Sequence, residues 1–439
     1  MKKVVKFGGS SLASASQFEK VGKIIRAEKS RRYVVPSAPG KRFSSDTKVT
    51  DMLYGCYAKA EKGEDFSEEL AQIKARYQEI IDGLQLKLTL DEAFSVIEED
   101  FKNQAGTQYA ASRGEYLNGM VMAAYLGFAF VDSATVIRFH EDGSLDNETT
   151  DRLLAEALDK QEYAVIPGFY GADATGKVRT FSRGGSDITG SLVARAVKAD
   201  MYENWTDVSG CLVTDPRIVE NPVPIDIITY RELRELSYMG ASVLHEDAIF
   251  PVRSEGIPIN IRNTNCPEDK GTMIVGDTCS KSEYIITGIA GKKGFASVTI
   301  EKDMMNTEIG FGRKVLQVFE DNNISFEHMP SGIDTMTILV HETEFAEHEQ
   351  KVLTGIQKAV HPDHISLEAD LALIAVVGRG MKSARGTAGR IFSALAHVHV
   401  NVKMIDQGSS ELNIIIGVEN SDFETAIRAI YNIFVLCKL

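Results

Sequence analysis

Cysteine and long apolar runs are both scarce in this chain of 439 residues. The five cysteines are odd in number and show no CxxC or other paired spacing, which argues against a disulfide framework or a zinc site. The longest nearly apolar run, residues 119–131, has about 13 residues, whereas a membrane-spanning helix needs ~20. No signal peptide is expected, because Lys6 and the glycines after it interrupt the apolar start. We therefore expect a cytoplasmic protein with reduced thiols and no membrane partner.

Positive charge is also in short supply. Lysine and arginine number 48 against 62 aspartates and glutamates, which gives a net charge of −14. A protein that binds a nucleic-acid backbone needs a basic surface, so we expect no nucleic-acid partner. A single nucleotide such as ATP is not excluded, because glycine turns and a few cations are enough to bind its phosphates. The length predicts roughly three domains.

Glycine, in contrast, is concentrated in residues 182–190, which read SRGGSDITG and precede a helical run of small residues. Its two glycines let successive N–H groups converge on one anion, and the helix N-terminus adds further N–H groups. Arg183 supplies a planar cation, and Asp187 a carboxylate suited to Mg²⁺ or a substrate ammonium. The alternative is an ordinary strand-to-helix turn with Ser186 as its N-cap.

A second glycine turn follows the first expected strand. Residues 2–7 alternate lysine with valine and run into GGSS, and a capping box of Ser16 and Glu19 then opens a helix. This arrangement places Lys6 at the carboxyl end of a strand, where ligands of open α/β sheets collect and where a lysine can neutralise a transferring phosphoryl group. The alternative is that Lys6 reaches solvent from an edge strand.

Other candidates follow further expected strands and helices. Ser37 and Thr50 lie near loop ends, where hydroxyls bind small polar substrates or simply stabilise the loop. A charged helical stretch spans residues 64–103, and residues 112–116 are expected to form a turn that carries Glu115. Judged from the residues alone, Glu115 is better explained as a helix-start glutamate.

Two Thr-Asp pairs, Thr206-Asp207 and Thr214-Asp215, each follow an extended run. They can form the rim of a nucleotide pocket that Arg217 completes by reaching phosphates. Asx-type turns explain the same residues almost equally well.

Two further stretches resemble nucleotide-binding motifs but are incomplete. Residues 171–177 match the first seven positions of a P-loop, but Val178 replaces the hydroxyl that would hold Mg²⁺, so we expect a hairpin loop. Residues 378–383 begin like a dinucleotide fingerprint, yet Ser383 replaces its last glycine. A dehydrogenase is therefore the least favoured class.

The remainder of the chain holds a weak internal repeat of about 70 residues, which predicts two small α+β modules. The expected elements are a strand at 296–300, a helix at 310–322 and strands at 324–327 and 335–340, then a strand at 371–377, a helix at 386–397 and strands at 400–405 and 411–417. A strand at 285–290 is expected to join the second module, with the first module inserted after it.

Residues 6–11 (KFGGSS) and 181–187 (FSRGGSD) resemble the aspartokinases of the amino-acid-kinase family, and the repeat resembles paired ACT modules. The resemblance covers essentially the whole chain. It implies an α/β fold, with a three-layer αβα sandwich and a mainly parallel sheet over residues 1–280. ACT-like modules of βαββαβ order would follow at 281–365 and 366–439.

The implied activity is ATP-dependent phosphorylation of the β-carboxylate of L-aspartate to 4-phospho-L-aspartate, with Mg²⁺, as the first step of lysine, threonine and methionine biosynthesis. A carboxylate of pKa about 4 is already ionised at neutral pH, so no general base is needed. The difficulty is repulsion between two anions, which positioning and charge neutralisation overcome. The resemblance also implies feedback inhibition, with lysine as the expected effector and threonine as a second candidate, and a homodimer or dimer of dimers formed through the ACT modules.

The resemblance also assigns residues to roles, with no metal site made by the protein alone. The catalytic group is Lys6, Gly9 and Asp187; the substrate group is Ser37, Thr50, Glu115, Arg183, Gly185 and Ser186; the nucleotide group is Lys6, Gly8, Gly9, Ser10, Thr206, Asp207, Leu212, Asp215 and Arg217; and the effector group is Met304, Gly310, Phe311, Ser331 and Asp334. The chain departs from the common pattern at Leu212, where many relatives have tyrosine, at Ser242, where they often have lysine, and at Glu246, where they usually have proline.

Two other functions stay open at this stage. A related kinase that acts on glutamate shares the glycine turns, although it usually lacks the tandem ACT region. A non-catalytic amino-acid sensor is disfavoured by the intact set of Lys6, Glu115 and Asp187.

Overall fold

The computed structural model describes residues 1–182, 184–241, 244, 246–276 and 284–436, and it divides into two compact units. The first unit comprises the described residues of Met1–Cys211, Pro224–Tyr230 and Val243–Cys279, and the second those of Leu212–Val223, Arg231–Ser242 and Ser280–Leu439. The last segment of the second unit begins at Ser280, the final residue of the predicted catalytic domain. Two short earlier segments, predicted to lie in the catalytic domain, also belong to the second unit.

The first unit is built on an eight-stranded sheet of order β3-β5-β2-β1-β8-β10-β11-β9. Its strands are β1 (Lys3–Phe7), β2 (Arg31–Pro36), β3 (Ala129–Phe130), β5 (Ala164–Val165), β8 (Met201–Thr206), β9 (Ile227–Thr229), β10 (Ile259–Asn263) and β11 (Thr272–Val275). Every neighbouring pair is parallel except β10 with β11. The predicted mainly parallel α/β sheet is confirmed.

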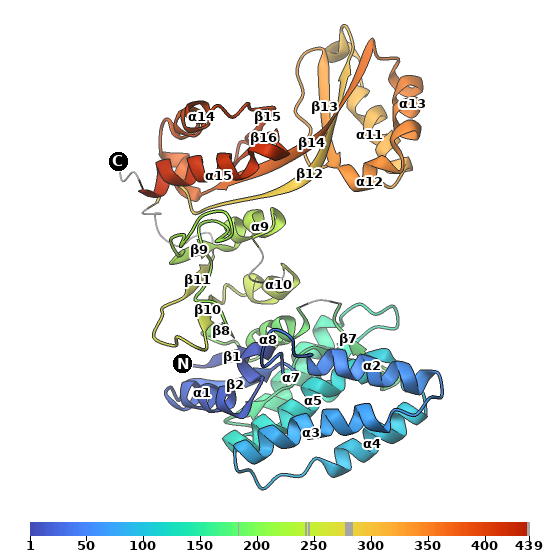
Figure 1. Ribbon diagram of the computed structural model, residues 1–439, viewed down its shortest axis with the longest axis vertical. Helices are drawn as coiled ribbons and strands as arrows, with labels where there is room; N and C mark the ends of the chain where they lie inside the picture. The colour runs from blue at the N-terminus through green and yellow to red at the C-terminus, as the bar shows by residue number, and fades with distance from the viewer. Residues whose placement is uncertain (183, 242–243, 245, 277–283, 437–439) are drawn as a thin grey trace. The chain divides into compact units, whose positions relative to one another are not determined.

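Helices cover both faces of this sheet (Figure 1). They are η1 (Gly9–Leu12), α1 (Ala15–Arg26), α2 (Val49–Glu61), α3 (Ser67–Gly83), α4 (Asp91–Lys102), α5 (Thr107–Leu126), α6 (Ser133–Val136), α7 (Asn147–Leu158), α8 (Gly185–Ala196) and α10 (Glu246–Ser254). α8 packs on β1, β2 and β8, and α7 and α10 pack on α8. No helix within the described ranges is both long and apolar enough to cross a membrane.

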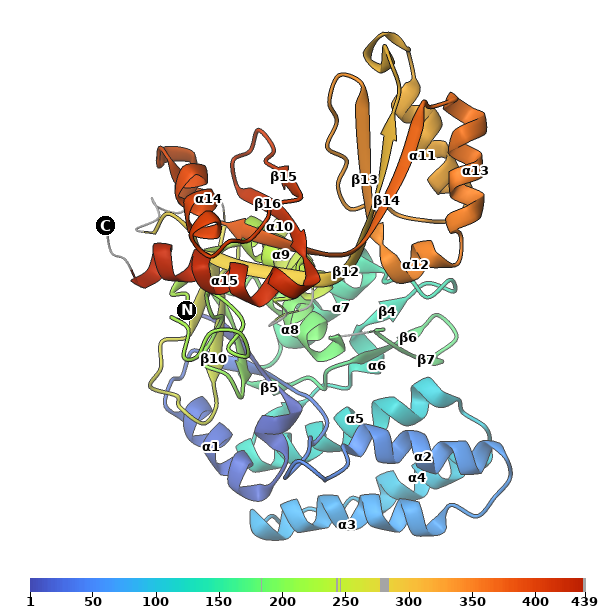
Figure 2. The ribbon, with the colours of Figure 1, turned by 45° about the horizontal axis from the view of Figure 1, so that its top comes forward.

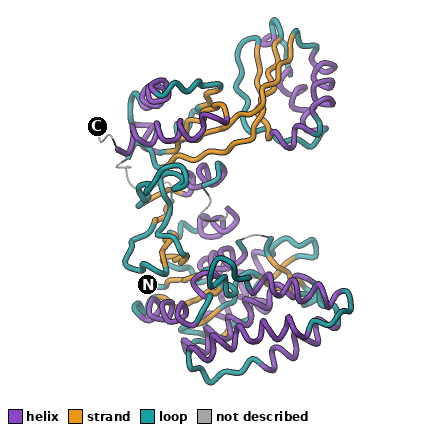
Figure 3. Tube along the Cα trace, viewed as in Figure 1, coloured by secondary structure: helices purple, strands orange, loops and turns teal. Residues whose placement is uncertain are grey.

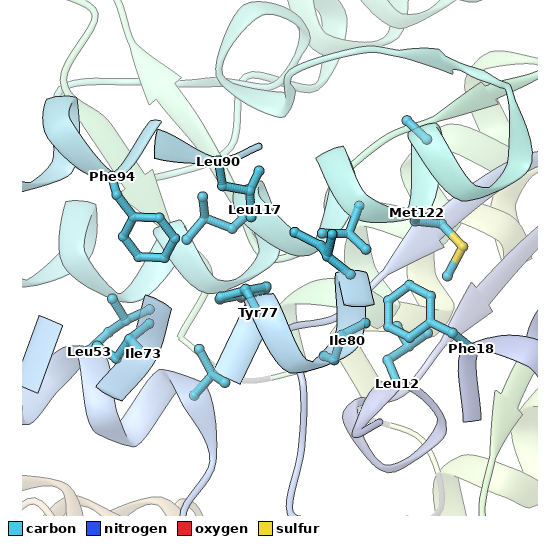
Figure 4. Close-up of a cluster of buried hydrophobic side chains, with 14 of the residues drawn as sticks. Leu12, Phe18, Leu53, Ile73, Tyr77, Ile80, Leu90, Phe94, Leu117 and Met122 are labelled. Carbon is cyan, nitrogen blue, oxygen red and sulfur yellow. The ribbon is translucent and has the colours of Figure 1, made fainter. Parts of the chain in front are cut away.

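The core of the first unit lies between α1–α5 and the opposite sheet face. Figure 4 shows Phe18, Tyr77, Phe94 and Leu117 converging there from four different helices. The Tyr77 hydroxyl, although fully buried, donates to the Gly114 carbonyl at 2.7 Å, so the packed helices also satisfy their polar group.

Several predicted boundaries in this unit are wrong. α1 starts after Ser14, whose hydroxyl accepts from Gln17 N, so the cap lies two residues before the predicted Ser16. The stretch 64–103 forms two helices, α3 and α4. The predicted turn at 112–116 lies inside α5, where small residues such as Gly114 let the helix approach Ala38.

The rejected P-loop segment is a hairpin, as predicted. β6 (Tyr170–Asp173) pairs antiparallel with β7 (Val178–Thr180), and β6 also pairs with β4 (Arg138–Phe139) in a small separate sheet. Asp173 closes the loop by accepting from Thr175 and Arg179.

The second unit is built on a five-stranded antiparallel sheet of order β13-β12-β14-β16-β15. Its elements are α9 (Tyr230–Tyr238, from Arg231 onward), β12 (Gly288–Glu301), η2 (Met305–Thr307), α11 (Phe311–Asp321), β13 (Thr335–His341), α12 (Glu342–Ala346), α13 (Glu349–Val360), β14 (His364–Val377), η3 (Arg379–Ser383), α14 (Thr387–His397), β15 (Met404–Asp406), β16 (Asn413–Glu419), η4 (Asn420–Asp422), α15 (Phe423–Tyr431) and η5 (Asn432–Leu436). Figure 2 shows α11 and α13 side by side against β12, β13 and β14.

Two long strands run through both halves of this sheet (Figure 3). β12 and β14 have 14 residues each. The first part of β12 pairs with Leu371–Val377, and its later part pairs with both β13 and the start of β14. The predicted strand at 324–327 is wrong: the nearby chain makes isolated bridges, between His328 and Leu339 and between Ser331 and Met336.

Candidate active site

Lys6 and Asp187 join the two glycine turns. Lys6 lies in β1 and is 8% exposed, and its Nζ is 2.5 Å from Asp187 Oδ1 in the first turn of α8. Gly8 lies two residues further along the chain, and a methyl group on Gly8 would lie 3.7 Å from Lys6 Nζ. Two stretches about 180 positions apart in the chain therefore form one local site with a cation at its centre.

The loop after β1 also contacts the loop after β2, through Gly9 and Gly40. Gly40 N donates to the Gly9 carbonyl at 2.8 Å. A methyl group on Gly40 would lie 2.6 Å from the Gly9 carbonyl carbon, and one on Gly9 would lie 2.9 Å from the Ala38 carbonyl oxygen. Only residues without a side chain permit this approach.

Arg76 holds the same two loops from the side of α3. Its Nη2 donates to the carbonyls of Ala13 and Gly40 at 3.0 and 2.9 Å, and its Nη1 is 2.8 Å from Asp46 Oδ2. The guanidinium is buried, so both the carbonyls and the carboxylate compensate a desolvated charge. Arg76 thereby fixes the distance between the loops that follow β1 and β2.

Glu115 is a buried carboxylate with an unused oxygen. It lies within α5 and is 6% exposed, and burial raises its pKa to about 8 although Ala38 N–H donates to the carboxylate. Its Oε2 has no hydrogen-bond partner within the described part of the protein. A buried acceptor without a donor is costly, and a ligand ammonium would satisfy it.

The first turn of α8 is shaped by close contacts around its glycines. Gly184 has a φ of 59°, in the left-handed region, and a methyl group on Gly185 would lie 2.5 Å from the Phe169 ring. Ser186 is buried, and its hydroxyl packs against Gly168. The helix N-terminus thus offers free N–H groups to an anion, whereas the predicted substrate residue Arg183 lies outside the described residues.

The predicted hydroxyl residues lie near this site. Ser37 follows β2, and its N–H donates to the Phe7 carbonyl at 3.1 Å. Ser10 lies in η1, and Thr50 in the first turn of α2 is partly buried.

The predicted nucleotide residues are divided between the two units. Thr206 ends β8 in the first unit, and its hydroxyl donates to the neighbouring Asp207 at 3.1 Å. Leu212, Asp215 and Arg217 belong to the second unit, where Arg217 forms a close ion pair with Asp215. The hydrogen bonds from Arg217 hold the pKa of Asp215 below its usual value. Ser242 and the side chain of Glu246 lie outside the described residues.

The donor set suits a magnesium ion that arrives with phosphates better than a resident metal. No group of three or more histidines, cysteines, aspartates or glutamates that could hold a metal occurs in the described ranges. Asp187 and Asp207 nevertheless place two carboxylates near the carboxyl ends of β1 and β8. Mg²⁺ typically takes one or two carboxylates together with substrate phosphates, so these residues fit that mode of binding.

The predicted effector residues lie in the second unit, around the turns next to α11 and β13. Met304 and Gly310 both have left-handed backbone, with φ of 60° and 81°, and Met304 is exposed. Phe311 is buried and begins α11. Ser331 and Asp334 are exposed beside β13, and the Asp334 carbonyl accepts from Lys302 N at 2.9 Å.

Three contributors to the site were missed from the sequence. Ala38 acts through its main-chain N–H, which no side-chain motif reveals. Arg76 lies on a helix whose charge suggests only a solvated surface. Asn204 lies opposite Lys6 in the neighbouring strand β8, and its amide donates to Asp187 Oδ1 at 2.9 Å. Strand alternation from Tyr202, combined with pairing of β1 and β8, is the signal that could have found Asn204.

Comparisons with known proteins agree with this geometry. The model of the amino acid kinase family matches residues 1–263, and an ACT domain model matches residues 374–434. The parallel sheet, the joined glycine turns and the ACT match define the class of protein, an amino acid kinase with an attached ACT region.

Individual relatives narrow the class. The chain is 41% identical to aspartokinase 3 of Bacillus subtilis over 98% of each protein. The crystal structure of Clostridium acetobutylicum aspartate kinase is 49% identical and superposes with a TM-score of 0.90, covering 99% of this chain and 100% of that one. Escherichia coli aspartokinase III in complex with lysine and aspartate is 25% identical, with a TM-score of 0.70 over 99% of each chain. This chain therefore belongs to the aspartokinases, and it is an aspartate kinase of amino-acid biosynthesis.

Proposed function

We propose that aspartate is phosphorylated on its β-carboxylate by ATP at the Lys6–Asp187 site, giving 4-phospho-L-aspartate. The observation that carries the proposal is the 2.5 Å ion pair between Lys6 and Asp187, which joins the two glycine turns. Lys6 neutralises the transferring phosphoryl group beside the turn formed by Gly8 and Gly9, in which the Gly8 N–H donates to the Trp205 carbonyl at 3.0 Å. Because the acceptor carboxylate is already ionised, the protein supplies charge and alignment and no general base.

The substrate is held between the loop after β2, α5 and α8. Glu115 has an unsatisfied buried oxygen and accepts the aspartate ammonium. Ser37 and Thr50 supply hydroxyls, and Gly185 and Ser186 direct N–H groups at a carboxylate. Arg183 is assigned to the α-carboxylate from the family resemblance alone.

The nucleotide is proposed to bind through Ser10, Thr206 and Asp207 of the first unit. Leu212, Asp215 and Arg217 are assigned to the nucleotide from the family resemblance alone. Its phosphates bring Mg²⁺, which Asp187 and Asp207 would help to hold, and the ion would spread the phosphate charge. Support for ATP as the phosphate donor comes from Escherichia coli aspartokinase III, which was crystallised in complex with aspartate and ADP and which, at 24% identity, shares the fold of this chain. Such a reaction is expected in the cytoplasm.

Feedback inhibition is proposed to act through the second unit, with lysine as the effector and threonine as a second candidate. Support comes from the lysine complex of Escherichia coli aspartokinase III. The proposed contacts are Met304, Gly310 and Phe311, before or at the start of α11, and Ser331 and Asp334, just before β13.

We also propose a homodimer or dimer of dimers that forms through the ACT region. β13 and β15 are the edge strands of the five-stranded sheet, and edge strands offer N–H and C=O groups for pairing. Light scattering after size-exclusion chromatography measures the assembly, and a monomeric mass at micromolar concentration would contradict it.

A coupled ADP-release assay with Lys6→Ala tests the proposed site. We expect a loss of kcat on the order of 10²–10³, because a preorganised charge at the phosphoryl group is removed. Lys2→Ala, at the exposed start of the same segment, is the matched control and should keep normal turnover. Normal turnover by Lys6→Ala would refute the site, and higher activity with glutamate than with aspartate would refute the substrate.

A further inference from the structure

Asn204 faces both members of the Lys6–Asp187 pair. It lies in β8 directly opposite Lys6 in β1, and it is 3% exposed. Its Nδ2 donates to Asp187 Oδ1 at 2.9 Å, and its Oδ1 lies 3.5 Å from Lys6 Nζ, the outer limit for a hydrogen bond. One buried amide therefore contacts a cation and an anion.

Only one orientation of this amide fits its surroundings. The reverse orientation would turn the NH₂ group toward the Lys6 ammonium and the carbonyl oxygen toward the Asp187 carboxylate, and both contacts would be repulsive. On the β10 side, the neighbour in register is the uncharged Ile261. The ion pair thus fixes the orientation of the Asn204 amide, and the amide in turn fixes the position of the Asp187 carboxylate.

β8 holds Asp187 at two points. The Tyr202 hydroxyl donates to the Asp187 carbonyl oxygen at 3.2 Å, while Asn204 donates to the side chain. This approach depends on Gly190, where a methyl group would lie 2.5 Å from the Tyr202 hydroxyl. Both the main chain and the carboxylate of Asp187 are therefore positioned by a single strand.

Lys6 Nζ and Asn204 Nδ2 contact the same oxygen, Oδ1 of Asp187. To neutralise a phosphoryl group, Lys6 has to turn away from Asp187, whose side chain is only 18% exposed. A partly buried carboxylate that loses its donors is costly. Because the Asn204 amide stays in place, Asp187 keeps a donor and the release of Lys6 becomes easier.

We propose that Asn204 is a positioning residue that orients Asp187 and allows Lys6 to move from Asp187 to the transferring phosphoryl group. It acts through these two side chains and does not contact either substrate. The inference rests on the proposed function, because it presupposes the role of Lys6 in phosphoryl transfer.

Steady-state kinetics of Asn204→Ala and Asn204→Leu test the inference. Asn204→Ala should lower kcat about tenfold, the effect of one hydrogen bond to a charged group. The KM values for ATP and aspartate should change by less than about threefold, since the binding loops are unaltered. The control is Asn260→Ala, a buried asparagine in β10 that lies opposite Glu203, and it should leave kcat within about twofold.

Asn204→Leu adds a readout that separates hydrogen bonding from packing. Leucine has nearly the shape of asparagine, but it cannot donate to Asp187 Oδ1. A purely structural role of Asn204 would therefore be restored by leucine. If the hydrogen bond matters, Asn204→Leu should lower kcat about tenfold, as Asn204→Ala does, with both KM values within about threefold of wild type.

The outcomes separate this inference from the proposed function. If Lys6→Ala is inactive but Asn204→Ala turns over within twofold of wild type, the role of Asn204 is overturned alone. Wild-type kcat in Asn204→Leu, or an equal loss in Asn260→Ala, overturns it as well. Wild-type turnover by Lys6→Ala overturns the proposed function itself. Melting temperatures verify folding, and the kcat of Asn204→Leu decides the question if Asn204→Ala does not fold.

Discussion

The two units use polar residues in opposite ways. In the first unit, Lys6, Glu115, Asp187 and Asn204 lie in or beside strands and helices, and they are wholly or largely buried around one site. In the second unit, Val298 of β12 and Ile338 of β13 pack with residues of α11 and α13, whereas Ser297, Thr299 and Thr337 line a pocket on the opposite sheet face. The proposed active site of the first unit therefore depends on desolvated charges, whereas the proposed effector residues of the second unit lie in or beside turns.

This difference predicts where substitutions act. Desolvated charges and close main-chain contacts tolerate little change, because each group lacks a substitute partner. The contacts of exposed turn residues are weakened by water, so removing one such contact should cost less binding free energy. Substitutions in the first unit should therefore affect turnover strongly, and those at the turns of the second unit should shift effector response moderately.

The largest effect is expected for Gly40→Ala. The added methyl group would lie 2.6 Å from the Gly9 carbonyl carbon, so the two loops must separate. A displacement of about 1 Å at a reacting centre costs on the order of 100-fold in kcat. Gly55→Ala is the control, since nothing lies within 4 Å of its position in α2, and helix propensity should stabilise it by about 1 kcal/mol. Equal activity of the two variants in the coupled assay would contradict the loop contact.

Glu115→Gln should raise the KM for aspartate about 10- to 100-fold, because the substrate ammonium loses its charged acceptor.

Glu115→Gln should also change the pH dependence of stability. The folded-state pKa of Glu115 is raised to about 8, so ionisation destabilises the wild type progressively as pH rises from about 4.5 to 8. The melting temperature of Glu115→Gln should match wild type near pH 4.5 and exceed it at pH 8.5. A constant difference across this range would show that the Glu115 pKa is not raised.

Arg76→Met should lower kcat about tenfold while changing both KM values less than about threefold, because each loop still binds its own reactant but their separation is less fixed. The control is Lys74→Met on the same helix, which removes only an exposed ion pair with Asp91. Initial-rate measurements that show an unchanged kcat and similar changes in both KM values would contradict the role of Arg76 in holding the two loops.

The smallest effect is expected in the second unit. Asp334→Ala should raise the lysine concentration for half-inhibition by about fivefold, the value of one exposed polar contact. Inhibition is measured relative to the turnover of each variant without lysine. An unchanged lysine response in Asp334→Ala and also in Met304→Ala would place the effector elsewhere.

The sequence predicts the centre of the site better than its surroundings. Lys6 and Asp187 were brought together through the family resemblance, which assigns both glycine turns to one site. Strand ends alone could not do this, because β7, the strand before the second turn, is antiparallel to β6 in the small separate sheet. Glu115 was assigned through the family resemblance, but its local structure was predicted wrongly. Gly114 suggests a turn in isolation, whereas here it lets α5 pack closely on Ala38.

Residues that act through tertiary contacts were not predictable in the same way. Arg76 reaches Ala13, Gly40 and Asp46 from a helix whose sequence shows only amphipathic charge. The false strand at 324–327 has a suitable local pattern, but local pattern does not determine which segment pairs with β13.

A double-mutant cycle on Lys6 and Asp187 tests most directly whether the two glycine turns form one catalytic pocket. Lys6→Ala, Asp187→Ala and the double variant are compared by kcat in the coupled assay. If the residues act as a pair, the double variant should lose about as much as the more damaging single substitution. Losses that multiply, so that the double variant shows the product of the two single effects, would contradict the account.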